Sequence, residues 1–383
     1  MRAIQTLVIA SLLLAPAAAA AQERADSAAF VVRLGRDTTS IERVVRTPTR
    51  VVAEAVQRSP STLLQRLVME LTPRGEVSRS VYTATRPGSA EPFFTRTMTV
   101  DGDSVTVVNT QGTNTSTRRI AARNAIPVTG PFYSPYEMAM MRAVAGRQPR
   151  TTVQLLQPSA TVDIPLERVG ADSIALTNQF QERMRARVDA RGRLLNLHTP
   201  AFTTVERVAW LELEPLVREF AARDAAGRGM GPLSPRQASR AFVGGANLWL
   251  DYSRPAMRGR PIWGALVPYG AVWRMGANDA AHFATDRRVR VGELTLEPGT
   301  YTLFLLPTAD AWTLVVNRKT GMSGLEHDPA ADVGRVPMTR ETLERPAEQF
   351  TMDLRPAANA PTGATLYVAW DRQAATVPIR VEP

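Results

Sequence analysis

The feature that most constrains the fold is a long succession of short segments in which apolar and polar residues alternate. Between residues 29 and 123, segments such as "AFVVRLG" and "SVTVVNTQG" are separated by turn residues such as "GRD" and "DGD". Alternation with a period of two places one set of side chains on each face of a strand. The regular spacing predicts an antiparallel β-sheet or barrel with little helix.

Two segments break this pattern and are predicted to be helices. Residues 134–146 carry Ser134 as a cap, Pro135 at the first helical position and Gly146 as a stop. A second helix is predicted to begin at Pro215 and to end at Gly227. The N-terminal region is therefore expected to be an antiparallel β-barrel or half-barrel with one or two helices.

The first predicted helix is rich in methionine, with Met138, Met140 and Met141. One interpretation is an apolar face that packs against the sheet. The other is a soft lid over an apolar cavity, because methionine is flexible and polarisable.

Residues 227–235, "GRGMGPLSP", are rich in glycine and proline and are predicted to be a linker. After it, strand-like segments such as "LEPGTYTLFLLP" and "AWTLVVN" predict a β-sandwich or jelly roll. The predicted organisation is a signal peptide at 1–21, an antiparallel β domain at 22–226, the linker at 227–235 and the sandwich at 236–383.

The N-terminus predicts export. Arg2 precedes an apolar run at residues 6–14, and small residues lead to a predicted cleavage site near Ala21. The pattern is typical of a bacterial secretory signal, which places the mature chain in the periplasm or outside the cell. The sequence contains no cysteine, which excludes disulfides, thiolate metal sites and a lipidated cysteine.

The formal net charge of +10 does not predict nucleic-acid binding. Lys319 is the only lysine, and the arginines are spread along the chain rather than clustered. Weak peripheral attraction to anionic polymers or lipids of the cell envelope is the expected consequence. No transmembrane segment and no cofactor are expected.

Several motifs of the C-terminal region resemble one family. They are "YSRP" at 252–255, "GRPIWG" at 259–264, "VPYGAVWRMGAN" at 267–278, "PGTYTL" at 298–303, and the strand at Trp312. Together they resemble the domain-of-unknown-function family 2911, over residues 234–383. The resemblance implies an exported bacterial all-β domain and implies no activity.

Residues 251–279, here called the arginine-aromatic segment, are the main candidate site. Guanidinium groups bind carboxylate, sulfate or phosphate, and aromatic rings stack on sugars or peptides. The candidate ligand-binding residues are Arg254, Arg258, Arg260, Trp263, Tyr269, Trp273, Arg274 and Asn278. The alternative is structural: ion pairs and ring packing could hold an irregular connection in shape.

The sequence leaves three functions open. The first is a non-enzymatic envelope protein that binds a glycan, peptide or other anionic ligand through the arginine-aromatic segment. The second is a hydrolase in which His282 acts as a base with Asp279 or Asp251. The third is a lipid or lipoprotein carrier that uses the N-terminal β domain.

No metal site is predicted. Glu326, His327 and Asp328 are adjacent, so their side chains point in different directions, and ligands at suitable spacing are missing. The identity of the ligand and the oligomeric state stay open.

Overall fold

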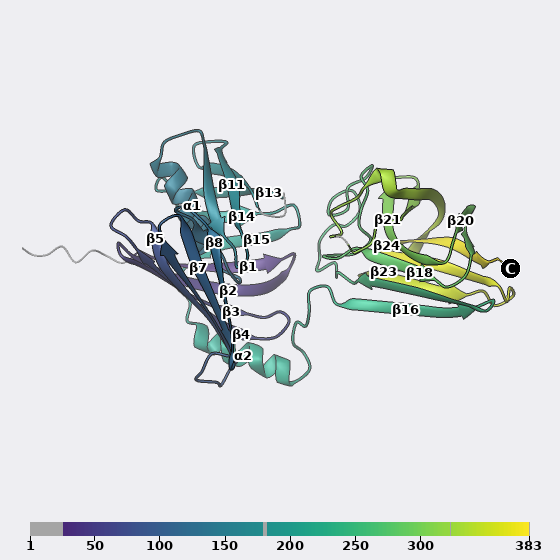
Figure 1. The fold of residues 1–383 in the computed structure, drawn as a ribbon, viewed down its shortest axis with the longest axis horizontal. Helices are drawn as coiled ribbons and strands as arrows, with labels where there is room; N and C mark the ends of the chain where they lie inside the picture. Colours follow the sequence, from purple (N-terminus) through teal and green to yellow (C-terminus); the bar gives the residue numbers. More distant parts are fainter. Residues whose placement is uncertain (1–25, 179–181, 322, 383) are drawn as a thin grey trace, which may run out of the picture.

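A computed structural model describes residues 26–178, 182–321 and 323–382, which form two β-sheets and two α-helices (Figure 1). The all-β class predicted from the alternating segments is thereby confirmed. The predicted signal peptide, residues 1–21, lies outside the described residues. Residues 226–235 connect the last element of the first sheet region to the first strand of the second.

The first sheet has fifteen strands and is here called the half-barrel. Its spatial order runs from β8 back to β1, then to β15, and from there back to β9. The strands are β1 (Asp26–Leu34), β2 (Asp37–Thr47), β3 (Arg50–Gln57), β4 (Leu63–Leu71), β5 (Val77–Thr85), β6 (Phe94–Asp101), β7 (Ser104–Gln111), β8 (Asn114–Ala121), β9 (Ile126–Pro127), β10 (Arg150–Leu156), β11 (Thr161–Arg168), β12 (Ser173–Thr177), β13 (Arg183–Val188), β14 (Leu194–His198) and β15 (Thr203–Val208).

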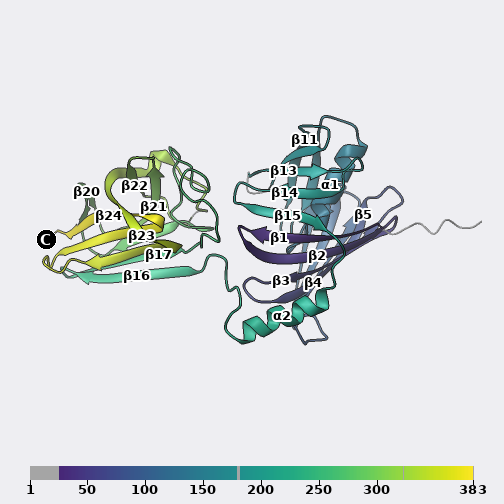
Figure 2. The same cartoon turned by 180° about the vertical axis from the view of Figure 1, so that it is seen from behind.

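The two edges of the half-barrel approach one another. β8 lies at one edge and β9 at the other, yet only residues 122–125 connect them. Five Cα–Cα steps put the strand ends at most about 18 Å apart, so the sheet must curl until its edges are close. Buried residues of β6, β7 and β8 accordingly pack against Leu156 of β10. Figures 1 and 2 show the curled sheet from its two sides.

Around β1 the half-barrel is covered on both faces. On β1, Phe30 and Val32 belong to the inner core together with helix α1 (Ser134–Ala145). Val31 points to the other face, where it packs with helix α2 (Leu213–Ala225). Strand β1 is therefore buried on both sides, and successive residues serve two different cores.

Both predicted helices exist, with shifted starts. Tyr133 occupies the N-cap position of α1, and Ser134 is already helical. The first amides of this helix donate to the side chain of Glu42, so Ser134 is not needed as the cap. α2 begins at Leu213, two residues before Pro215. Among the described residues, no helix is long and apolar enough to cross a membrane.

The second sheet, here called the sandwich, has nine strands in the order β16-β17-β18-β21-β22-β23-β24-β19-β20. Strand β23 pairs with β22 through its first residues and with β24 through the rest, with register shifts between. This long strand passes from one layer to the other. The strands are β16 (Arg236–Val243), β17 (Ala246–Ser253), β18 (Ala281–Thr285), β19 (Val289–Val291), β20 (Leu294–Leu296), β21 (Gly299–Pro307), β22 (Trp312–Asn317), β23 (Asp332–Pro356) and β24 (Gly363–Val381).

Candidate ligand-binding site

Charged side chains lie inside the half-barrel, on the inner face of β2. Glu42 is paired in register with Phe30, a residue of the inner core, so Glu42 also faces inward. Val44 and Arg46 follow at intervals of two and share this face. Glu42 is 0% exposed and Arg46 is 8% exposed. Buried charges are costly unless they are paired, so their partners define what this interior does.

Glu42 holds the first turn of α1. Its carboxylate accepts hydrogen bonds from the amide of Tyr133 at 2.6 Å and from the amide of Ser134 at 3.1 Å. The first amides of a helix have no partner within the helix, and the helix dipole favours an anion there. Burial nevertheless dominates, and it raises the pKa of Glu42 to about 7.

Glu137 fixes the same helix one turn further on. This carboxylate is fully buried and accepts hydrogen bonds from the guanidinium groups of Arg46 on β2 and Arg207 on β15. Its Oε1 also accepts a hydrogen bond from the amide of Leu194 at 3.1 Å. Helix α1 is therefore attached to three strands through one buried carboxylate.

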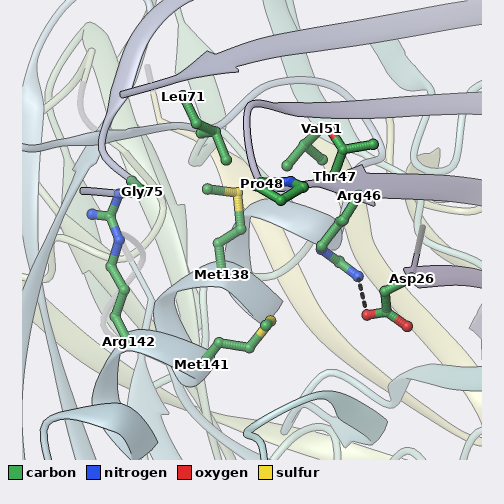
Figure 3. Close-up of a pocket in the computed structure, with 10 residues that line it drawn as sticks. All are labelled: Asp26, Arg46, Thr47, Pro48, Val51, Leu71, Gly75, Met138, Met141 and Arg142. Carbon is green, nitrogen blue, oxygen red and sulfur yellow. Dashed lines mark hydrogen bonds and ion pairs between the residues drawn. The ribbon is translucent and has the colours of Figure 1, made fainter. Parts of the chain in front are cut away.

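A pocket of about 390 Å³ opens beside this ion-pair cluster (Figure 3). Arg46 lies at one end and Arg142 at the other, with the methionines of α1 between them. The lining residues are Asp26, Arg46, Thr47, Pro48, Val51, Leu71, Gly75, Met138, Met141 and Arg142. The pocket thus combines apolar walls with two guanidinium groups.

Arg46 has hydrogen-bond donors to spare in this pocket. Its Nη2 binds Glu137, but its Nε and Nη1 are buried and have no hydrogen-bond partner among the described residues. Nη1 lies 3.6 Å from Oδ2 of Asp26, which is an ion-pair distance but too long for a hydrogen bond. Buried donors without a partner are rare in native structures, so Arg46 is an unusual side chain in this pocket wall.

Arg142 supplies the second positive charge. Its guanidinium donates to the carbonyl oxygens of Asn124 at 2.9 Å and Gly75 at 3.2 Å, and it has no carboxylate ion pair in the described part of the chain. Burial lowers the pKa of Arg142, and the charge of Glu76 opposes this effect. An arginine held only by neutral carbonyls leaves its charge available to an anion.

The sandwich places the arginine-aromatic segment differently. Trp263 and Trp273 pack with Trp370 of β24 and with Phe350 of β23 in one aromatic cluster. The Trp263 ring also lies 4.2 Å from Trp312, centroid to centroid. The indole of Trp263 donates to the carbonyl of Trp370. These two partly buried tryptophans therefore pack against the sandwich core.

Three of the four arginines of this segment bind the protein through a terminal guanidinium nitrogen. Arg254 donates to the carbonyl of Phe350 and to side chains of Gln237 and Thr351. Arg258 forms an ion pair with Asp37 of the half-barrel at 2.6 Å. Arg260 donates to backbone carbonyls of residues 201, 256 and 257. These contacts match the structural alternative for the arginines.

The remaining residues of the segment are more open. Tyr269 is 44% exposed. Arg274 makes a single long hydrogen bond, from Nε to the carbonyl of Gly276 at 3.4 Å. Asn278 has a positive φ of 60° and its carbonyl accepts from the amide of Gly324. Arg274 is thus the segment's least occupied guanidinium.

The residues of the hydrolase alternative are adjacent but are not arranged as a base and its acid. His282 and Asp251 are opposite one another on β17 and β18. Asp251, however, binds the guanidinium of Arg236, and His282 has no hydrogen bond among the described residues. Burial lowers the pKa of His282, which favours the neutral ring. Asp279 forms a backbone bridge with Ser323.

The predicted polar loop near His327 is organised by hydrogen bonds. His327 Nε2 lies 2.9 Å from Oδ1 of Asp332, and Asp328 accepts from the amide of Ala330. Across the described residues, no group of three histidine or acidic side chains is placed to hold a metal ion.

The sequence reasoning missed Glu42, Arg46, Glu137 and Arg142. A signal existed in β2, where "IERVVR" places a charged residue on each face in turn. Alternation alone could not reveal which charges face inward, because the outer face of this strand is also partly buried, at Ile41 under α2.

A half-barrel followed by a sandwich defines a two-sheet, all-β protein. Residues 234–379 match the family described as "Protein of unknown function (DUF2911)", which confirms the resemblance noted in the sequence. No curated protein matches the chain. A crystal structure of a β-barrel-like protein of domain of unknown function DUF1849 from Brucella abortus is similar with a TM-score of 0.31 and 9% identity, covering 47% of this chain and 93% of that chain.

Proposed function

We propose that this protein is an exported envelope protein whose half-barrel binds an amphiphilic anion, such as a fatty acid or a lipid with an anionic headgroup. The pocket beside α1 is the binding site. The observation that carries the proposal is Arg46, whose buried Nε and Nη1 lack hydrogen-bond partners in the described part of the chain.

The headgroup would lie between the two arginines. A carboxylate or phosphate oxygen near Arg46 would satisfy its spare donors in a charge-assisted bond, which is stronger than a neutral one. Arg142 adds a second positive charge at the opposite end of the pocket. Asp26 also lines the pocket, but it already pairs with Arg193 at 3.2 Å.

The tail would lie against the methionines. Met138 and Met141 of α1 face Leu71, Val51 and Pro48 across the pocket. Thioether side chains adapt to chains of different shape, which suits an acyl group. The volume of about 390 Å³ lies within the range of about 300–1,000 Å³ that is usual for small-molecule sites.

The test is a fluorescence titration with 11-(dansylamino)undecanoate, an anionic amphiphile. The wild-type protein is expected to bind one equivalent saturably. Met141→Asp places a negative charge in the pocket wall and is expected to weaken binding at least tenfold. Met141→Asn introduces a neutral side chain of the same size as aspartate and is expected to weaken binding less. Arg46→Lys keeps a charge for Glu137 but loses the guanidinium fork, and is also expected to weaken binding.

The matched control is Arg66→Lys, an arginine whose side chain is 48% exposed and pairs with Glu54 away from the pocket. It should bind the probe like the wild type. Equal affinities of the Met141→Asp and Met141→Asn variants would contradict the proposal, as would the absence of saturable binding to folded wild-type protein.

A further inference from the structure

A second cavity, of about 370 Å³, lies between the half-barrel and the sandwich. Residues of both sheets line it. A neighbouring cavity opens into the interior of the half-barrel, and Leu34, Glu182 and Leu233 line both cavities. The half-barrel contributes Leu34, Glu182 and Ala201 to the lining, and the sandwich contributes Leu266, Trp273 and Arg274.

Direct contacts hold the two sheets together beside this cavity. Arg258 pairs with Asp37, and its carbonyl accepts from the amide of Arg36 at 2.9 Å. Arg260 donates to the carbonyl of Ala201 at 3.2 Å. Gly35 packs so closely that a Cβ there would lie 2.2 Å from the Arg258 carbonyl oxygen. These contacts fix the half-barrel side and the sandwich side of the cavity relative to one another.

Arg274 lines the cavity, and most of its hydrogen-bond donors have no partner among the described residues. Its aliphatic stem is held by Gly324, where a Cβ would lie 2.6 Å from Cδ of Arg274. Within the described residues, its two Nη atoms have no hydrogen bond and no ion pair, since its one contact is made by Nε. Burial lowers the pKa of Arg274, and the negative charge of Glu182 across the cavity opposes this shift.

Glu182 forms the opposite pole. Its Oε2 accepts from Nδ2 of Asn178 at 3.0 Å, and its Oε1 has no partner among the described residues. Apolar walls, including Leu266, Phe304 and Leu325, lie along the same cavity. The cavity thus presents one cation, one carboxylate and an apolar lining.

We infer that this cavity binds a short peptide with both termini free, its carboxylate at Arg274 and its ammonium group at Glu182. A simple anion would satisfy Arg274 but would face the like charge of Glu182, which is unfavourable. A zwitterion satisfies both groups, and apolar side chains suit the walls. The site is separate from the pocket beside α1 and does not depend on it.

The experiment is isothermal titration calorimetry with the tripeptide Leu-Ala-Leu, its N-acetyl form and its C-terminal amide. The wild-type protein is expected to bind the free tripeptide saturably and to lose at least tenfold in affinity when either terminus is blocked. In Arg274→Gln, amidation should no longer matter while acetylation still does. In Glu182→Gln, the pattern should reverse.

The control variant is Arg288→Gln, an exposed arginine of the sandwich that pairs with Glu297. It should reproduce the wild-type pattern. Thermal unfolding of each variant checks that both sheets are still folded. Equal affinities for free and blocked peptides in the wild type, or no saturable binding up to about 10 mM, would overturn the inference.

Discussion

The two sheets bury very different interiors. The half-barrel encloses a helix that is held by buried carboxylates and guanidinium groups, namely Glu42, Glu137 and Arg46. The sandwich encloses an aromatic cluster around Trp370, which is 1% exposed, and no acidic side chain is buried among its described residues. Protonation would change the charged interior, whereas the aromatic interior holds no buried acidic group to titrate within the described residues.

This difference reverses the expectation from composition. The arginines that stand out in the sequence lie in the sandwich, but three of the four use a terminal guanidinium nitrogen to bind the protein, and the fourth, Arg274, donates only through Nε. Arg46, which is inconspicuous in the sequence, keeps unpartnered donors in a pocket. The number of arginines in a segment therefore says less about ligand binding than the partners each one has.

The largest effect is expected from Glu137→Gln. The variant leaves Arg46 and Arg207 buried without their shared carboxylate, and breaking a buried pair costs about 3–5 kcal/mol. Hydrogen exchange should show lost protection in α1 and unchanged protection in β24 of the sandwich.

Glu219→Gln is the control for that variant. Glu219 pairs with Arg223 on the surface of α2, with both side chains about half exposed, so the expected cost is below about 1 kcal/mol. Similar losses in the two glutamate variants would show that the cluster does not hold the helix.

The second effect is a pH dependence confined to the half-barrel. The pKa of Glu42 rises from its ordinary 4.5 to about 7, so the folded state holds this proton more tightly than the unfolded state. The resulting stability is complete below about pH 4.5 and is lost as pH rises through 7, by roughly 3 kcal/mol. Glu42→Gln removes this term and should have a flatter stability profile between pH 4.5 and 7.

Melting curves of the two proteins across this range, together with exchange in α1, measure the difference. Identical pH profiles for the wild type and Glu42→Gln would mean that Glu42 is ionised throughout and that burial does not dominate its titration.

A third test uses two glycines in hairpin turns of the half-barrel. Gly192 has a φ of +80°, and a Cβ there would lie 2.7 Å from the Cα of Met141 in α1. Gly102 has a φ of +59° and no atom within 4 Å of such a Cβ. Both alanine variants carry backbone strain of about 1–2 kcal/mol, but Gly192→Ala must also displace the helix.

Gly192→Ala is therefore expected to lose at least about 1 kcal/mol more than Gly102→Ala in denaturant unfolding, and to weaken binding of the dansyl probe. Equal losses of unfolding free energy in the two variants, with unchanged probe binding, would show that the turn at Gly192 does not support the helix that lines the pocket.

The smallest effect is expected where the two regions meet. Arg258→Ala removes the ion pair with Asp37, a partly exposed contact worth about 1 kcal/mol or less. Each sheet should melt as in the wild type, while small-angle X-ray scattering should detect a broader distribution of distances between the sheets. An unchanged distribution would show that other contacts fix the arrangement.

The local elements of the fold could be predicted from sequence because turn signals are local. The turns at "GRD" and "DGD" and the methionine-rich helix follow from the residues of those segments alone. The interior charges could not be assigned, because the side on which Glu42 lies depends on α2 covering the outer face from far along the chain. The roles of Arg258 and Arg260 depend equally on residues of the other sheet.

The central claim is that the half-barrel pocket binds an amphiphilic anion, and it is tested most directly by calorimetric titration with dodecanoate and dodecyltrimethylammonium. These ligands share a chain length and differ in headgroup charge. The account predicts saturable binding of one dodecanoate below its micellar concentration, with dodecyltrimethylammonium at least about tenfold weaker, and loss of this preference in Met141→Asp. Equal binding of the two amphiphiles, or binding of neither, would contradict it.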